Sequence, residues 1–90
     1  MRLSDEQIRE RLAGLDLWEH KEGRLVKRYG FPDFRAALAF VVMVGLLAER
    51  ADHHPDITLG YGSVEVLLYS HDAEGVTERD FLLAEQIDAL

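Results

Sequence analysis

Hydrophobic residues recur along the chain at two different spacings, and the changes of spacing divide the sequence into predicted helices and strands. In LSDEQIRERLAGL, residues 3–15, the apolar positions follow a near-helical spacing. Ser4 stands where an N-cap is expected, acidic residues fill the first turn, and Gly14 lies near the end. We predict a short amphipathic helix over this segment.

The next segment, LWEHKEGRLVKRYGF at residues 17–31, has the pattern of two strands joined by a turn. Leu25, Tyr29 and Phe31 repeat with a period of two, and Gly23 within KEGR suits a tight turn. Lys27 falls on the same face and interrupts its apolar pattern. We therefore predict a hairpin with one cationic residue on its apolar side.

Pro32 and Asp33 open a second predicted helix, which differs from the first because it has no polar face. Residues 36–48, AALAFVVMVGLLA, are apolar without a break. The run is too short to span a bilayer, for which about 20 residues are needed, so protein must cover it. One sheet hides one side only, and a second copy of the chain is the natural cover for the other. A helix buried wholly within one chain is the alternative.

The last third of the chain predicts a second hairpin and a third helix. Residues 57–61 alternate, Gly62 turns the chain, and residues 64–70 are rich in Val and Leu. Thr77 is placed to cap a helix in TERDFLLAEQIDAL. The predicted order is α-β-β-α-β-β-α, which gives an α+β fold of one domain over residues 1–90, with an antiparallel four-stranded sheet and three helices on one face.

Composition limits the partners that this domain is expected to have. Ten Lys and Arg against 17 Asp and Glu give a net charge of −7, which argues against direct binding to nucleic acid. The chain has no cysteine and a charged N-terminal segment without a signal-peptide core. We expect a cytoplasmic protein that does not enter a membrane. A domain of 90 residues buries only part of its surface, so we also expect a homodimer or homotetramer.

The candidate chemistry lies where the second helix ends, in AERADHHPDITLGYG at residues 48–62. Pro55 disfavours helical geometry before it, so His53 and His54 are expected at a helix C-terminus. Glu49 lies four residues before His53, and Asp52 is adjacent. These acidic groups and the helix dipole favour a protonated ring. On this argument His53 is the more readily charged of the two histidines.

A third histidine, His71, is predicted to join this pair. In the second hairpin Val64, Val66, Leu68 and Ser70 share one face of the strand, and His71 ends that strand. Antiparallel pairing brings residues 70 and 71 near residues 53–55, so His71 arrives beside the pair. Three imidazoles can hold zinc, but adjacent histidines seldom direct both rings at one ion, and we expect no metal. Nucleophilic catalysis and phosphate binding lack their motifs here.

These residues resemble the signature of the pterin-4a-carbinolamine dehydratase family. The shared pattern comprises ERADHHP, then Tyr61, then His71 after nine intervening residues, then GVTERD ending at Asp80. The resemblance extends to GRLVKRYGFPDFRAALAF and to Trp18 before the first strand. A lone HHP would be weak, but the joint spacing is specific.

The resemblance implies an enzyme that dehydrates 4a-hydroxytetrahydrobiopterin to quinonoid dihydropterin in tetrahydrobiopterin recycling. It implies no cofactor and no metal. His53, His54 and His71 would be catalytic, since histidine can give or take a proton near neutral pH. The implied pterin-binding and supporting residues are Glu49, Asp52, Tyr69, Ser70, Asp72, Arg79 and Asp80.

Other features of the family leave room for a second interpretation. Many members have an aromatic residue where this chain has Ile57, and its loss puts substrate affinity in question. Trp18 could flank the pocket or belong to the core. Some members act as dimerisation cofactors for transcription or as carboxylase assembly factors, so a non-catalytic role is the alternative. Retention of all three histidines favours the enzyme.

Overall fold

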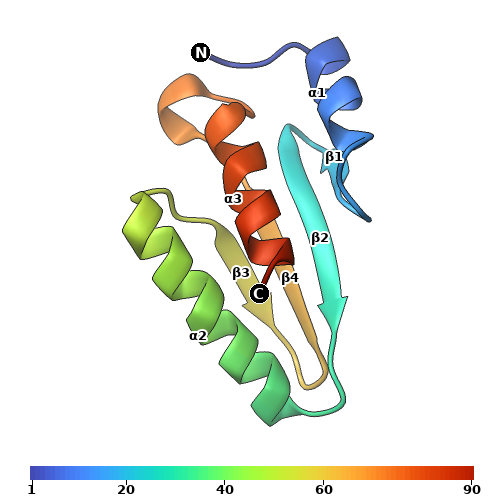
Figure 1. The fold of residues 1–90 in the computed structure, drawn as a ribbon, viewed down its shortest axis with the longest axis vertical. Coiled ribbons are helices and arrows are strands. Elements are labelled where there is room, and N and C mark those ends of the chain that lie inside the picture. The colour runs from blue at the N-terminus through green and yellow to red at the C-terminus, as the bar shows by residue number, and fades with distance from the viewer.

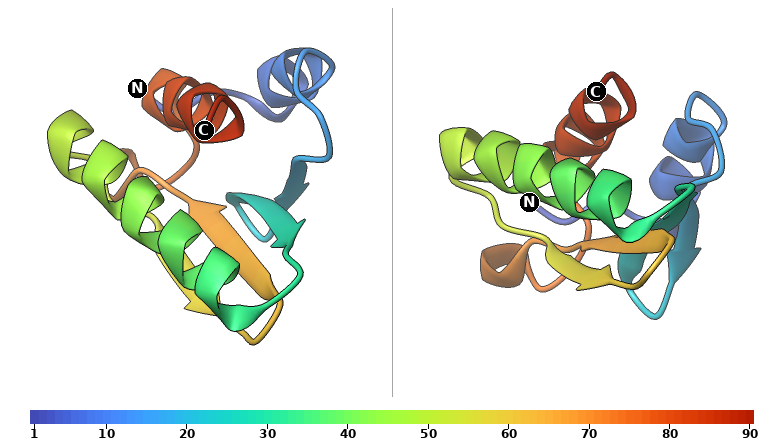
Figure 2. Two further views of the ribbon diagram at one scale, coloured as in Figure 1. Left: turned by 60° about the horizontal axis from the view of Figure 1, so that its bottom comes forward. Right: turned by 90° about the horizontal axis from the view of Figure 1, so that it is seen from below.

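The computed structural model describes all 90 residues, and its elements follow the predicted order. The elements are α1 (Asp5–Leu12), β1 (Glu19–Lys21), β2 (Arg24–Gly30), α2 (Phe34–Ala51), β3 (Asp56–Leu59), β4 (Ser63–Leu68), the 3-10 turn η1 (His71–Ala73) and α3 (Glu78–Asp88). The strands form one antiparallel sheet in the order β1-β2-β4-β3 (Figure 1). The helices lie on one face of this sheet, and the α+β prediction is confirmed (Figure 2).

The predicted caps explain where each helix begins. Ser4 accepts from the backbone N–H of Gln7 in a capping box, and the Asp33 side chain accepts from the N–H of Ala36 at 2.8 Å. Thr77 caps α3 in the same manner as Ser4. Such caps satisfy backbone donors that have no partner within the helix, so short polar residues fix the helix starts.

The first hairpin turns at Glu22 and Gly23, whose φ angles are 52° and 78°. Two consecutive residues of positive φ make the tight turn that matches the twist of paired strands. Gly23 therefore has the role that the sequence predicted. The register that follows pairs Leu25 with Leu68, which are both fully buried.

Lys27 does interrupt the apolar face of β2, and it is only 9% exposed. Its Nζ donates to Asp88 Oδ1 at 2.9 Å and stands 4.8 Å from the centre of the Tyr29 ring. Trp18 Nε1 donates to the other Asp88 oxygen at 3.0 Å. Trp18 is therefore a core aromatic residue that holds the end of α3.

The apolar helix α2 is covered on one side only. Ala37, Phe40, Val44 and Ala48 face the core, whereas the side chains of Leu38, Val42, Met43 and Leu46 are 43–66% exposed. The alternative of a helix buried wholly within one chain is therefore wrong. No helix combines the length and apolarity needed to cross a membrane.

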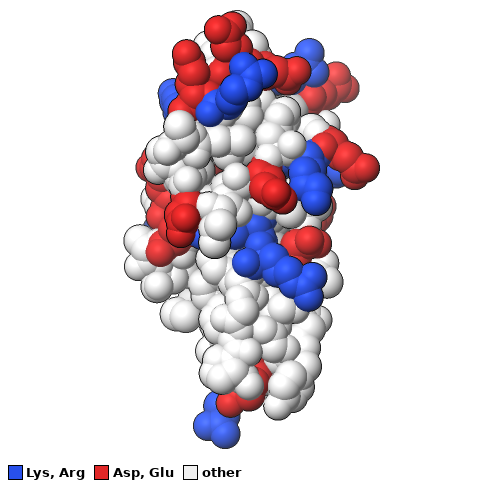
Figure 3. Space-filling view, turned by 90° about the vertical axis from the view of Figure 1, so that its right-hand side faces the viewer, with Lys and Arg blue, Asp and Glu red and all other residues white.

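Charge is unevenly distributed over the face that Figure 3 shows. Charged side chains gather towards the end that carries α1, and the opposite end, where β2 leads into α2, is mostly uncharged.

Candidate active site

A cavity of about 420 Å³ lies at the C-terminal end of α2, and all three predicted histidines line it. We call it the histidine cavity. Its lining residues are Asp52, His53, His54, Pro55, Asp56, Tyr69, His71, Asp72 and Arg79. His71 therefore lies beside the pair as predicted, but it does not end a strand, because β4 ends at Leu68 and His71 begins η1.

The end of α2 sends the two adjacent histidines into different environments. Asp52 adopts the left-handed conformation, with φ 51° and ψ 44°, and the chain leaves the helix there. The N–H of His53 still bonds to the carbonyl of Ala48 at 3.1 Å. As a result, the side chain of His53 is 9% exposed and that of His54 is 58% exposed.

His53 is held by a buried carboxyl group from the first turn of α3. Its Nε2 lies 2.5 Å from Asp80 Oδ1, and Asp80 has no exposed surface. Asp80 Oδ2 accepts from Ser70 Oγ at 2.8 Å and from the N–H of Thr77 at 2.9 Å. Because one partner on a histidine ring decides which nitrogen is free, this contact leaves Nδ1 as the nitrogen of His53 without a protein partner.

Glu49 pairs with His54, so the predicted pairing of Glu49 with His53 is wrong. Glu49 Oε1 lies 2.8 Å from His54 Nε2. The i−4 argument assumed that helical geometry continues to His53, but the left-handed Asp52 ends it and His53 faces α3 instead. The nomination of His53 as the more readily charged ring therefore loses its support from Glu49.

His71 packs against an aromatic neighbour. The rings of Tyr69 and His71 meet edge to face with centres 4.9 Å apart. The guanidinium carbon of Arg24 stands 5.3 Å from the centre of the Tyr69 ring. Arg24 was missed by the sequence analysis, because only the pairing of β2 with β4 brings the start of β2 to this place.

An exposed ion pair stands at the edge of the histidine cavity. Arg79 donates to Asp72 Oδ1 at 2.6 Å. That hydrogen bond lowers the pKa of Asp72 below its usual value and raises the pKa of Arg79. Both groups therefore stay charged at neutral pH, and they give this edge one anion and one cation.

Three of the predicted binding residues do not line the cavity. Ser70 and Asp80 are buried behind His53, and Glu49 stands outside against His54. Ile57 packs against the hydrophobic core, so its side chain is directed away from the cavity. Pro55 and Asp56, which directly follow the histidine pair, line the cavity and were missed. No group of three or more His, Asp or Glu side chains is arranged to hold a metal ion.

Comparison with known proteins finds one family over the whole chain. The sequence model described as "Pterin 4 alpha carbinolamine dehydratase" matches residues 1–90. Relatives whose names place them in the same family occur in Roseiflexus sp. (strain RS-1) and Thermomicrobium roseum. Each is 47% identical over 89 residues, a match that covers 99% of this chain and 96% of the relative.

Solved structures show the same fold with two different descriptions. A transcriptional coactivator/pterin dehydratase from Brucella melitensis superposes with a TM-score of 0.94 at 34% identity, covering 99% of this chain and 97% of that one. A pterin dehydratase-like protein described as a RuBisCO assembly factor in the alpha-carboxysome gives a TM-score of 0.66 at 26% identity, with 80% and 83% coverage. The full-length match and the 47% identity show that this chain belongs to the pterin-4-alpha-carbinolamine dehydratase family.

Proposed function

We propose that this protein is a dehydratase, which converts 4a-hydroxytetrahydrobiopterin to quinonoid dihydropterin and water in tetrahydrobiopterin recycling. The observation that carries the proposal is the histidine cavity, where three imidazoles with different surroundings line one space. A cavity of about 420 Å³ lies within the range that small-molecule ligands occupy. Carboxyl groups at Asp52, Asp56 and Asp72 can bind the amino and ring N–H groups of a pterin.

The reaction needs one proton acceptor and one proton donor. The hydroxyl group on carbon 4a takes up a proton and leaves as water. The proton on N5 passes to a base, so the substrate loses H₂O overall. Groups with pKa values near neutral pH suit both transfers, and each such group typically supplies about 10²–10⁴-fold in rate.

We assign the base role to His53. Its Nε2 faces the buried Asp80, and a carboxyl group in that position stabilises the imidazolium that forms when Nδ1 takes a proton. His54 and His71 are then the candidates for protonating the departing hydroxyl group. Glu49 orients His54, and Tyr69 orients His71.

The proposed roles of the remaining predicted residues follow from their burial. Ser70 and Asp80 have no surface for a pterin and serve as positioning residues for His53. Asp72 and Arg79 stand at the edge of the cavity, where their charges can meet the polar rim of the substrate.

A rate measurement tests the dehydratase. Purified protein should accelerate dehydration of 4a-hydroxytetrahydrobiopterin over buffer. His53→Ala, His54→Ala and His71→Ala should each lower kcat/KM by at least about tenfold. The matched control is His20→Ala, because His20 is the fourth histidine of the chain and lies outside the histidine cavity. Wild-type turnover in all three cavity variants contradicts the assignment.

The exposed apolar face of α2 supports a homodimer or homotetramer. Leu46 is 66% exposed on this face, so Leu46→Glu places a charge in the proposed interface without disturbing the core. We expect this variant to dissociate while staying folded, as judged by light scattering and circular dichroism. Leu17→Glu is the control, since Leu17 is 73% exposed and lies outside α2. A wild-type monomer at micromolar concentration contradicts the proposal.

A non-catalytic assembly role is the second candidate. The same α2 face supports it, and structural relatives described as a coactivator and as an assembly factor share the fold. This role predicts the opposite pattern of variants. The histidine variants would keep partner binding, and Leu46→Glu would lose it.

A further inference from the structure

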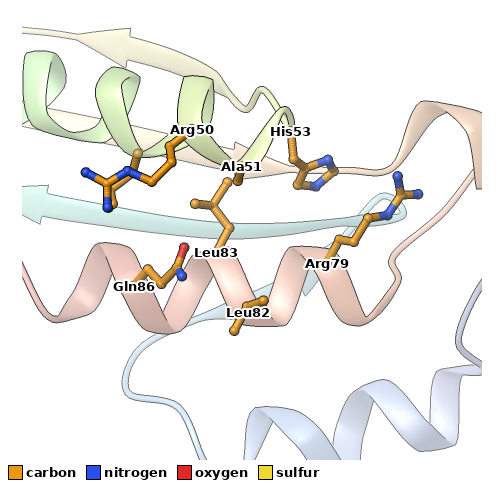
Figure 4. Close-up of a pocket in the computed structure, with 8 residues that line it drawn as sticks. Arg50, Ala51, His53, Arg79, Leu82, Leu83 and Gln86 are labelled. Carbon is orange, nitrogen blue, oxygen red and sulfur yellow. The ribbon is translucent and has the colours of Figure 1, made fainter.

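A second cavity, of about 320 Å³, lies between α2 and α3. We call it the α2–α3 cleft. Its lining residues are Leu47, Arg50, Ala51, His53, Arg79, Leu82, Leu83 and Gln86. Figure 4 shows Arg50 and Gln86 at one end, His53 and Arg79 at the other, and Leu83 between them. The cleft is therefore elongated, with polar ends and an apolar middle.

The charge of the cleft is opposite to that of the whole protein. The chain carries 17 acidic and 10 basic residues, yet two arginines and no acidic residue line the cleft. Arg79 is paired with Asp72, which belongs to the histidine cavity. Arg50 takes part in none of the ion pairs of the structure, so it is the uncompensated cation of the cleft.

We propose that the α2–α3 cleft is a second ligand site, which binds a small organic anion with an apolar body. A guanidinium group and a side-chain amide are suited to a carboxylate or phosphate, because both present N–H donors to its oxygens. Arg50 and Gln86 hold the anionic group. Leu47, Leu82 and Leu83 cover the apolar body.

The cleft shares two residues with the histidine cavity. His53 and Arg79 line both. An occupant of the cleft therefore reaches the ring that Asp80 holds, and its binding should change the resonances of His53. The site itself does not depend on the proposed dehydratase, since anion binding requires no turnover.

Titration of the full chain by NMR, without pterin, tests the proposal. The probes are hexanoate, hexyl phosphate, 1-hexanol and hexylammonium, which share one apolar chain and differ in the head group. We expect the two anions to shift the side-chain amide of Gln86 and the backbone amides of Ala51 and Leu82. The alcohol should bind at least about fivefold more weakly, and the ammonium ion should cause no saturable shift. The tighter of the two anions identifies the head group that the site prefers.

Paired arginine variants locate the binding. Arg50→Gln should weaken hexanoate binding by about five- to tenfold. Arg35→Gln is the matched control, because Arg35 is exposed on the same helix but does not line the cleft. Equal affinity for the anion, the alcohol and the ammonium ion overturns the proposal. So does an equal effect of the two variants, or a set of shifts confined to His54 and His71. None of these results bears on the dehydratase assay, which uses a different substrate and different variants.

Discussion

The two ends of α3 carry carboxyl groups with different roles, one buried and one partly exposed. Asp80, in the first turn, has no exposed surface and holds His53 of the histidine cavity. Asp88, the last residue of the helix, holds Trp18, Lys27 and Tyr29. Each carboxyl group accepts several hydrogen bonds, but only one of them faces the proposed chemistry. A dense polar network is therefore not by itself evidence of an active site.

Helix position explains why the two networks differ in composition. The helix dipole favours an acidic group at the N-terminus and disfavours it at the C-terminus. Asp80 is on the favourable side, and uncharged donors from Ser70 and Thr77 join His53 around it. Asp88 is on the unfavourable side, where the ammonium group of Lys27 offsets the dipole.

Removal of Asp80 should have the largest effect of any change in this comparison. Asp80→Ala leaves the ring of His53 and the N–H of Thr77 without their partner, whereas Ser70 keeps its hydrogen bond with the hydroxyl group of Thr77. An unsatisfied buried group costs about 1–3 kcal/mol, so for these two groups we expect a loss of about 2–6 kcal/mol in the free energy of unfolding. We also expect kcat/KM to fall by at least about tenfold.

Asp80→Asn separates the catalytic part of that effect from the structural part. The N–H of Thr77 and the hydroxyl group of Ser70 require an oxygen, so the amide nitrogen faces His53. His53 must then accept at Nε2 and carry its proton on Nδ1, which removes the proposed base. The variant should keep most of its stability in urea and lose activity. Wild-type activity in Asp80→Asn contradicts the role of Asp80 as a positioning residue.

Removal of Asp88 should affect stability alone. Asp88→Ala leaves a nearly buried ammonium group on Lys27 and an unpaired hydroxyl group on Tyr29. Loss of one partner of a buried ion pair costs about 3–5 kcal/mol, and the partial exposure of Asp88 reduces this to about 2–3 kcal/mol. Urea denaturation measures the loss. The kcat/KM of the folded fraction should stay within about twofold of wild type, and a tenfold fall would show that the two ends of α3 are coupled.

Lowering the pH should remove the stability that Asp88 contributes to the fold, within a defined range of pH. Burial alone would raise the pKa of Asp88, but the hydrogen bonds from Tyr29, Lys27 and Trp18 outweigh it and hold the pKa below its usual value. A carboxyl group of lowered pKa stabilises the fold above its unfolded pKa of about 3.9, and this stabilisation is lost as the pH falls through the folded value.

The advantage of wild type over Asp88→Asn in the free energy of unfolding should therefore be constant above about pH 5 and shrink below about pH 4. Urea titrations at a series of pH values measure this difference. A difference that stays constant down to pH 2 contradicts the assignment of this acid sensitivity to Asp88.

The features of the fold and the site that depend on local sequence rules could be predicted from the sequence. Ser4, Asp33 and Thr77 each begin a helix because a short polar side chain satisfies free backbone donors nearby. The placement of His71 beside His53 and His54 followed from hairpin pairing, which is also regular, although His71 lies in η1 beyond the end of β4.

Contacts across the molecule could not be predicted in this way. Lys27 was identified as an interruption of a strand face, but its partner Asp88 is 61 residues away. Asp80 was named through the family resemblance, without its contact to His53, because one left-handed residue at Asp52 decides where that ring points. Helical periodicity in the sequence does not reveal which residue adopts the left-handed conformation that ends the helix.

The pairing of Glu49 supplies the smallest predicted effect, and it tests the corrected geometry directly. Glu49 and His54 have side chains that are 79% and 58% exposed, and ion pairs of this kind contribute about 0–1 kcal/mol. Glu49→Gln should therefore change the free energy of unfolding by less than about 0.5 kcal/mol and kcat/KM by at most about threefold. The NMR chemical shifts of the ring protons should change for His54 in this variant and stay the same for His53, since Glu49 contacts only the His54 ring. A shift of His53 alone would restore the i−4 pairing and would mean that the helix continues past Asp52 in solution.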